Sequence, residues 1–107
     1  MSKARQKGTA WESAIVRYLQ EHGHPFAERR AMAGALDKGD ILLPGCMIEA
    51  KAERQFSLAT YLKEVRAQTA NCPPGTVGVA WVKAPGKSVD DSYVVMDPAT
   101  FLRLLGE

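Results

Sequence analysis

The feature that most constrains the fold of this chain is a pair of short apolar runs, residues 41–43 and 46–48, on either side of Pro44-Gly45. Such runs around a Pro-Gly pair indicate two strands joined by a tight turn. In a hairpin that is symmetric about the turn, the numbers of facing residues sum to a constant, so Ile41 faces Ile48. A second register stays open, because Pro-Gly favours a type II turn, and a loop of odd length shifts the pairing by one residue.

The symmetric register also brings two acids together. Asp40 then faces Glu49 with Cβ atoms about 4.5–5.5 Å apart, and like charges in such positions destabilise a sheet. In the shifted register Glu49 is diagonal to Asp40. Lys51 follows Glu49 by two residues and points to the same face. Either Asp40 caps a turn while Glu49 and Lys51 form a weak surface pair, or the two acids hold a hard divalent cation, which prefers several carboxylate oxygens on one side.

The bulk properties predict a single domain that spans residues 1–107. An apolar content of 46% and a charged content of 24% are ordinary for a soluble globular protein. The sequence contains neither an apolar run of membrane-spanning length nor a recognisable secretory signal. Cys46 and Cys72 lack the spacing of a metal site or a disulfide scaffold, so we expect a reducing, cytoplasmic location and no contact with a membrane.

The charge is distributed unevenly along the chain. The net charge is only +2, but the first thirty residues hold six basic side chains against three acidic ones. If Glu12, Asp40 and Glu49 serve a cation, the remaining surface is more basic than the total suggests. This distribution is compatible with a polyanionic partner.

The periodicities predict helices and strands in the order α-β-β-β-α-β-β-α. Thr9 and Glu12 match a capping box, which predicts a helix over residues 10–22. Residues 31–38 have no clear period and are predicted to be a loop. The other predicted elements are strands at 25–30, 40–43, 46–51, 76–82 and 92–96, a helix from Ser57 to before Pro73, and a helix after Asp97-Pro98. The result is an α/β domain with a mixed sheet flanked by helices, in which strand 76–82 is central and parallel to a hairpin strand.

This order and its acids resemble a known family. A helix that carries a glutamate, a βββαβ core and the acids of "GD…EAK" resemble the restriction-endonuclease-like fold of the PD-(D/E)xK nucleases. The segments "KGTAWESAIVRYLQEHG" and "GDILLPGCMIEAK" are similar to the archaeal-type Holliday junction resolvases and their small phage relatives, which have a Lys-Gly pair ahead of the helix glutamate, as Lys7-Gly8 stands ahead of Glu12. The resemblance covers roughly residues 5–82. Gly39 replaces the proline that names the motif, and residues 31–38 lack a serine that is frequent in the resolvases.

The resemblance implies roles for individual residues. Asp40 and Glu49 would bind a metal, with the carbonyl of Ala50 as a further ligand. Lys51 would polarise the attacking water or offset charge in the transition state. Glu12 would hold a metal-bound water or a second ion, a role that can coexist with its place in a capping box. The implied cofactor is Mg²⁺, for which Mn²⁺ would substitute, because Mg²⁺ needs only one or two carboxylates from a protein.

Further residues are expected to contribute around this site. The expected phosphate contacts are Arg5, Lys7, Arg29, Arg30 and Lys38, although exposed charges of this kind are often only solvated. Glu64 and Gln68 fall on one helical stripe. Related nucleases place a glutamine on this helix near the site, so these two residues are accessory candidates, with a solvated helix face as the alternative.

The expected function is a Mg²⁺-dependent, structure-specific endodeoxyribonuclease that resolves four-way DNA junctions during recombination, in a bacterial or phage-infected host cell. A four-way junction has approximate two-fold symmetry and needs two matched nicks, so this function requires a homodimer. Two alternatives remain. The chain could be another nuclease of the same fold that acts on flaps, single strands or duplex DNA, or a DNA-binding module without catalysis.

Overall fold

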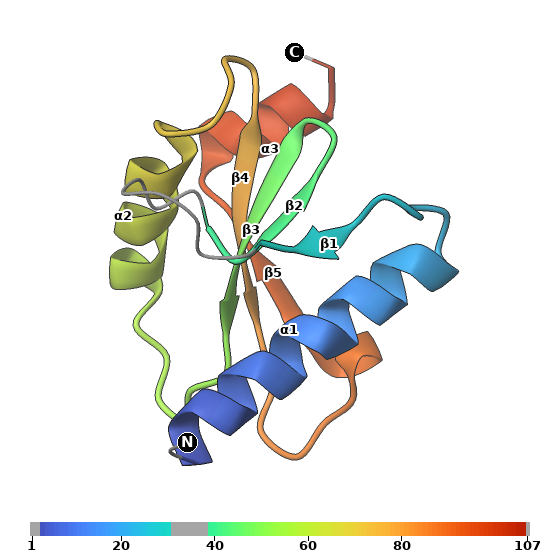
Figure 1. Cartoon of the computed structure of the whole chain (residues 1–107). Helices are drawn as coiled ribbons and strands as arrows, with labels where there is room; N and C mark the ends of the chain where they lie inside the picture. The colour runs from blue at the N-terminus through green and yellow to red at the C-terminus, as the bar shows by residue number, and fades with distance from the viewer. Residues whose placement is uncertain (1–2, 31–38, 107) are drawn as a thin grey trace.

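The hairpin forms with the symmetric register. β2 (Ile41–Leu43) and β3 (Cys46–Lys51) are antiparallel, and Ile41 lies opposite Ile48. The register shifted by one residue is therefore wrong. A computed structural model describes residues 3–30 and 39–106, with their side chains from Gly8 onward (Figure 1).

The hairpin belongs to a five-stranded mixed sheet with the strand order β1-β2-β3-β4-β5. β1 (Glu28–Arg29) pairs antiparallel with β2, β4 (Val77–Val82) runs parallel to β3, and β5 (Tyr93–Val95) pairs antiparallel with β4. The parallel pairing confirms the prediction for this part of the chain. The sequence predicted that strand 76–82 would be the central strand. In the structure the central strand is β3, and β4 lies between β3 and β5.

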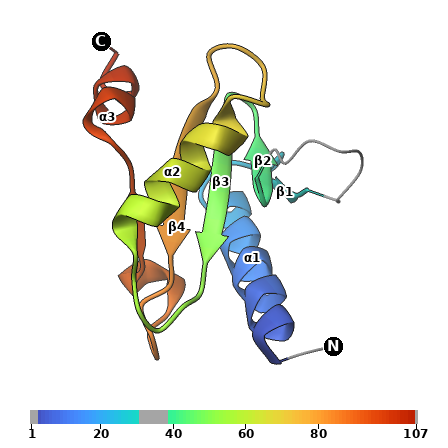
Figure 2. The same ribbon diagram turned by 90° about the vertical axis from the view of Figure 1, so that its left-hand side faces the viewer.

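Two helices cover opposite faces of the sheet (Figures 1 and 2). α1 (Lys3–Glu21) packs Trp11 and Ile15 against one face, and α2 (Leu58–Thr69) packs Tyr61 and Val65 against the other. Trp11 also donates a hydrogen bond of 3.1 Å from Nε1 to the carbonyl oxygen of Trp81, which fixes α1 on β4. Both tryptophans are buried.

The alternation of side chains along β3 decides what faces each helix. Ile48 joins the cluster under α1, whereas Met47 joins the cluster under α2. Because successive residues of a strand point to opposite faces, Glu49 and Lys51 lie on the α2 side with Met47. The charged residues of β3 are thereby placed under one helix.

The N-terminal elements differ from the prediction. α1 begins at Lys3 rather than at Ala10, so Thr9 lies inside the helix and the capping-box interpretation is wrong. The Lys, Arg and Gln residues that precede Thr9 are good helix formers, so the helix extends through them. β1 has two residues, where the sequence predicted a strand over 25–30. The predicted loop 31–38, including Lys38, lies outside the described residues.

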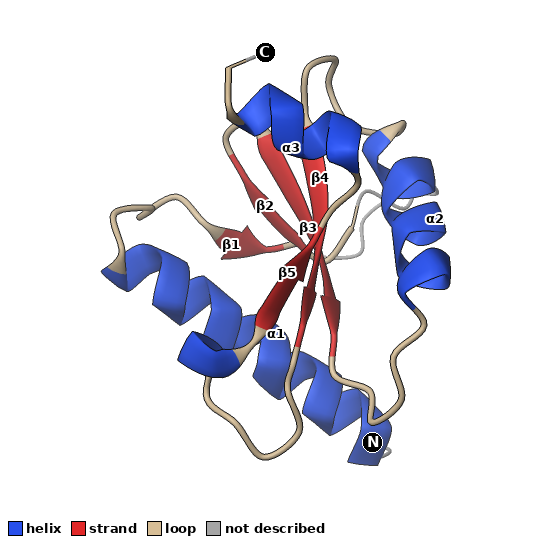
Figure 3. Cartoon of the chain, turned by 180° about the vertical axis from the view of Figure 1, so that it is seen from behind, coloured by secondary structure: helices blue, strands red, loops and turns tan. Residues whose placement is uncertain are grey.

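The C-terminal elements follow the prediction more closely. A short 3₁₀ helix, η1 (Val89–Asp91), precedes β5, and α3 (Pro98–Leu104) begins where Asp97-Pro98 predicted. The carboxylate of Asp97 caps α3 by accepting a hydrogen bond of 2.8 Å from the Thr100 amide. No residue of α3 is buried, and the helix packs beside β4 at one end of the sheet (Figure 3). In the described part of the chain, no helix combines the length and apolar character needed to cross a membrane.

Gly39 is required by the backbone where the chain enters β2. Its φ is +94°, in the region that L residues avoid, and a Cβ here would lie 2.2 Å from Sδ of Met47. Met47 is fully buried in the cluster under α2, so moving its side chain aside would disturb the packing there. Proline fixes φ near −65° and is excluded at this position for the same reason. Glycine at this position, where the proteins that the sequence resembles have a proline, is thus required by this backbone.

We therefore expect Gly39→Ala to destabilise the fold more than Gly45→Ala. Gly45 also has a positive φ, of 77°, but open space around it, so alanine there costs about 1–2 kcal/mol of backbone strain. At Gly39 the same strain is joined by overpacking against Met47, which adds about 1–3 kcal/mol. Urea unfolding of the two variants measures the difference, and equal midpoints would contradict the close approach of Met47.

Candidate functional site

Asp40 is held in place by the backbone on both of its sides. Its amide donates to the Ile48 carbonyl at 3.1 Å, and its carbonyl accepts from the Arg30 amide at 2.8 Å. Its side chain accepts a hydrogen bond of 3.0 Å at Oδ2 from the amide of Ala50. These contacts extend the hairpin by one residue beyond Ile41 and fix the carboxylate of Asp40 against β3.

Glu49 lies beside this carboxylate and is buried. The residue is 6% exposed, and its Oε2 accepts no hydrogen bond from the described residues. Burial, a proton shared with Asp40 and the negative charge of Asp40 together raise the pKa of Glu49 to about 9, against the opposing effects of Gln68 and Lys51. Without a cation, Glu49 is therefore protonated at neutral pH.

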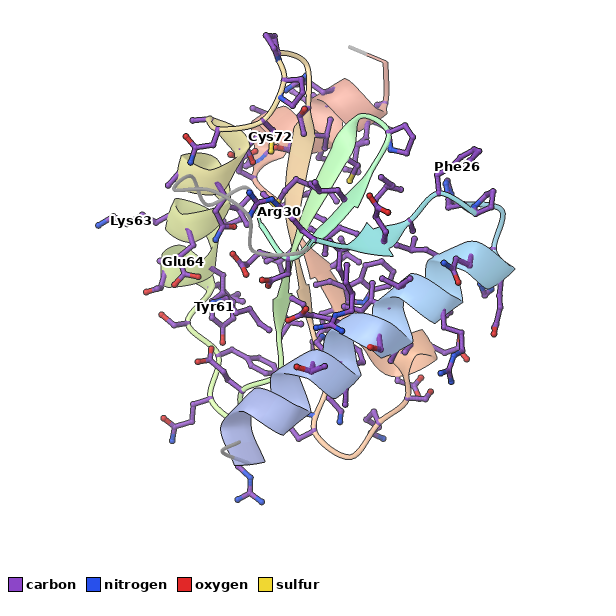
Figure 4. All side chains as sticks on the ribbon, in the orientation of Figure 1. Phe26, Arg30, Tyr61, Lys63, Glu64 and Cys72 are labelled. Atoms are coloured by element: carbon purple, nitrogen blue, oxygen red, sulfur yellow. The ribbon has the colours of Figure 1, made fainter. Side chains whose placement is uncertain are left out.

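Lys51 is tied to α2. Its Nζ lies 2.5 Å from Oε2 of Glu64 and 5.3 Å from the ring centroid of Tyr61, and both partners project from α2 (Figure 4). Burial by itself lowers the pKa of Lys51, but the hydrogen bond to Glu64 and the charges of Glu49, Glu64 and Glu53 outweigh burial and raise it. The ammonium is therefore charged at neutral pH, on the same side of β3 as Glu49.

Tyr61 extends this network away from the two carboxylates. It is 2% exposed, and its hydroxyl donates to Oε1 of Glu53 at 2.5 Å and lies 3.3 Å from the carbonyl of Gln55. The sequence marks Tyr61 only as an apolar position of the helix, and no spacing signal links it to Glu53. Its contact with Lys51 appears only once α2 is packed on the sheet.

Glu12 connects α1 to β1 near Asp40. Its Oε1 lies 3.2 Å from Nε of Arg29. Burial first, and then the charge of Asp40, raise the pKa of Glu12, while the hydrogen bond and charge of Arg29 lower it. Glu12 is thus close enough to Asp40 for their charges to interact. The described residues nevertheless contain no group of three His, Cys, Asp or Glu side chains that could hold a metal ion.

The remaining predicted residues divide into three groups. Gln68 is buried on α2 and hydrogen-bonds to Glu49, and Glu64 pairs with Lys51, so the structure brings both accessory candidates to the site. Arg29 and Arg30 lie at β1, next to Glu12 and Asp40 respectively. Arg5 and Lys7 lie in the first two turns of α1, where only the backbone is described, and Lys38 lies outside the described residues.

The donor set of Asp40 and Glu49 fits a hard divalent cation. Both residues offer carboxylate oxygens, and Oε2 of Glu49 is buried and accepts no hydrogen bond from the part of the chain that the structure describes. A magnesium ion takes one or two carboxylates from a protein and fills its other positions with water. A cation at this place would replace the proton of Glu49 and offset the charge of both carboxylates.

Comparisons of this chain with protein-family models, with curated proteins and with solved structures found no match.

The raised pKa of Glu49 predicts a pH-dependent gain in stability for Glu49→Gln in buffer with chelator. In the unfolded chain a glutamate has a pKa of about 4.3. Because the folded pKa is higher, the folded state binds this proton more tightly, and the stability that it contributes is lost as the pH rises from about 4.3 towards 9. Glutamine removes the loss, so we expect Tm to rise by about 5 °C or more at pH 8 and little at pH 5.

Thermal unfolding by circular dichroism at the two pH values measures this effect. Glu28→Gln is the matched control, because Glu28 is exposed on β1 and undergoes the same chemical change. A Glu49→Gln variant with the same change in Tm at pH 5 and pH 8 would contradict the assignment of a buried, protonated Glu49.

Proposed function

We propose that this protein is a Mg²⁺-dependent endodeoxyribonuclease with the restriction-endonuclease-like core of the PD-(D/E)xK family, and that its substrate is a four-way DNA junction. One observation carries the proposal. A buried carboxylate oxygen of Glu49 has no donor among the described residues, beside the fixed carboxylate of Asp40 and on the same side of β3 as the ammonium of Lys51. A fold gains nothing in stability from such a pair of acids, whereas a cation site requires it.

Asp40 and Glu49 would hold the metal in this proposal. Bound Mg²⁺ supplies a water of lowered pKa and a Lewis acid for the phosphate oxygens. The Ala50 amide orients Asp40, and Gln68 orients Glu49, so neither carboxylate must reorganise when the ion arrives. The Ala50 carbonyl and Glu12 are further oxygen donors, the latter after release from Arg29.

Lys51 would act on the charge of the scissile phosphate. Its ammonium is positioned by Glu64 and by the face of Tyr61. In cleavage, negative charge grows on the phosphate oxygens and on the leaving oxygen, and a fixed cation stabilises that charge in the transition state more than in the ground state. Arg29 and Arg30 would bind neighbouring phosphates from β1.

The choice of a junction rests on sequence resemblance and on symmetry. One chain carries a single site, so two matched nicks require two copies. β5 and α3 both carry exposed apolar side chains, which a second copy could bury. They are Tyr93, Val94, Phe101, Leu102, Leu104 and Leu105. A nuclease for flaps, single strands or duplex DNA would use the same catalytic residues without needing this dimer, and a non-catalytic module would not need Lys51 beside the acids.

The experiment is a cleavage panel of junction, flap, duplex and single-stranded DNA, with Mg²⁺ or with chelator, alongside light scattering at micromolar concentration. We expect a dimer that cuts the junction in two opposed strands only with Mg²⁺, and we expect Asp40→Asn to bind DNA but not to cut it. Wild-type rates in Asp40→Asn would refute the site. A monomer that nicks flaps or duplex well would favour the alternative nuclease.

Lys51→Ala should slow single-turnover cleavage by about 100-fold or more while leaving metal affinity nearly unchanged. The expected loss appears in the rate because the ammonium interacts chiefly with charge that develops during the reaction. Lys63→Ala is the matched control, since Lys63 is exposed on α2 and points away from the site (Figure 4). Loss of Mg²⁺ binding in calorimetry, with normal cleavage at excess metal, would show that Lys51 has a different role.

A further inference from the structure

A group of basic side chains lies where β3 and β4 end, outside the residues considered so far. Arg54 follows β3, and Lys83 and Lys87 follow β4; we refer to these three residues as the strand-end cluster. Arg54 and Lys87 are exposed, and Lys83 is half-buried. Within residues 3–30 and 39–106, none of the three has an acidic partner within ion-pair distance.

The cluster is joined directly to the candidate site. The Lys83 amide donates to the carbonyl of Lys51 at 2.8 Å, so Lys83 leaves the sheet beside Lys51. The Nζ of Lys83 lies 5.9 Å from the ring centroid of Trp11, the residue before Glu12 on α1. Lys83 therefore contacts the two elements that carry Lys51 and Glu12.

A tight turn fixes the rest of the cluster. The Lys87 amide donates to the Ala84 carbonyl at 3.0 Å, and Gly86 has a φ of +74°, which is the pattern of a type II turn with Pro85 and Gly86 at its centre. Between this turn and the chain after β3 lies a hollow of about 160 Å³, lined by Ala52, Glu53, Arg54, Lys83, Pro85 and Gly86. The one acid among these residues, Glu53, accepts a hydrogen bond from Tyr61.

The same end of the molecule carries the start of α1. In Figures 1 and 2 the N-terminus of α1, the loop after β3 and the loop after β4 lie together at the bottom of the molecule. The sequence there begins "KARQK". The carboxyl ends of strands in an open α/β sheet are also where ligands of such sheets usually bind.

We infer that the strand-end cluster binds the sugar-phosphate backbone of the DNA strand that is cut, next to the scissile phosphate. The inference rests on the proposed function and adds a contact region to it. Neighbouring strands are about 4.8 Å apart, so the backbones of Lys83 and Lys51 are adjacent, with Lys51 directed towards Tyr61 on the α2 face and Lys83 towards Trp11 on the α1 face. A DNA strand that passes the ends of β3 and β4 would meet both ammonium groups. No acidic side chain of the described residues pairs with these cations, so their positive charge is available to DNA phosphates. Contacts to the DNA backbone position a substrate without reading its sequence.

The test compares the salt dependence of DNA binding in chelator, where cleavage is absent. The double variant Arg54→Ala with Lys87→Ala should bind more weakly, and the slope of log affinity against log salt should fall by about 1.8 on duplex arms, two contacts at about 0.9 each. The control is Lys63→Ala with Arg17→Ala, which removes the same charge from exposed positions on α2 and α1. Circular dichroism verifies that both double variants fold.

The position of the contact is tested with substrates in which a neutral methylphosphonate replaces one phosphate at a time around the cut. Wild type should lose affinity at one or two phosphates beside the scissile one, and the Arg54/Lys87 double variant should be insensitive at those same phosphates. An unchanged slope in that variant, or the same reduction in the control, overturns the inference even if wild type cuts junctions. If the cleavage panel shows no nuclease activity, a reduced slope confined to the Arg54/Lys87 variant still supports binding of the DNA backbone by the cluster, and only its place next to a scissile phosphate is refuted.

Discussion

The backbone register of one hairpin determines where the charged groups of the site lie. Asp40 is beside Glu49 because Ile41 pairs with Ile48, and a slip of one residue would turn the side chains of one strand to the opposite face. The slip is opposed on both faces, since Ile48 packs under α1 and Met47 packs under α2. The hydrophobic cores thus maintain an arrangement of acids that electrostatics alone would not form.

The charged residues on the two faces of the sheet have different partners. On the α2 side, Glu64 and the ring of Tyr61 compensate the charge of Lys51. On the α1 side, Arg29 pairs with Glu12. Between them, Gln68 and the charge of Lys51 favour the ionised form of Glu49, but burial and the carboxylate of Asp40 outweigh them and favour the neutral acid. Asp40 and Glu49 therefore hold a proton at the middle of the site.

Sequence reasoning succeeded where the signal was local. The Pro44-Gly45 turn, the Asp97-Pro98 helix start and the apolar spacing of α2 each depend on a few neighbouring residues, and each element formed as predicted. The start of α1 was missed because Thr9 and Glu12 fit a capping pattern inside a longer run of helix formers. The pairing of Glu12 with Arg29, and of Lys51 with Glu64, joins separate elements, and no spacing rule predicts which acid a long basic side chain will meet. The strand-end cluster was missed for a similar reason, since Arg54 and Lys83 come together only through the parallel pairing of β3 and β4.

The loose attachment of α3 has a consequence for the dynamics of the molecule. Polar contacts hold this helix, through Asp97 to Arg66 of α2 and through Arg103 to the carbonyl of Gly75, and no side chain of α3 is buried. The free energy of opening a segment depends on the apolar surface and the hydrogen bonds that it loses, so α3 belongs to the part of the fold that opens most easily. Its amide hydrogens will exchange with solvent while the sheet under α1 and α2 stays closed. The C-terminal helix can therefore rearrange against a partner without cost to the hairpin that carries Asp40 and Glu49.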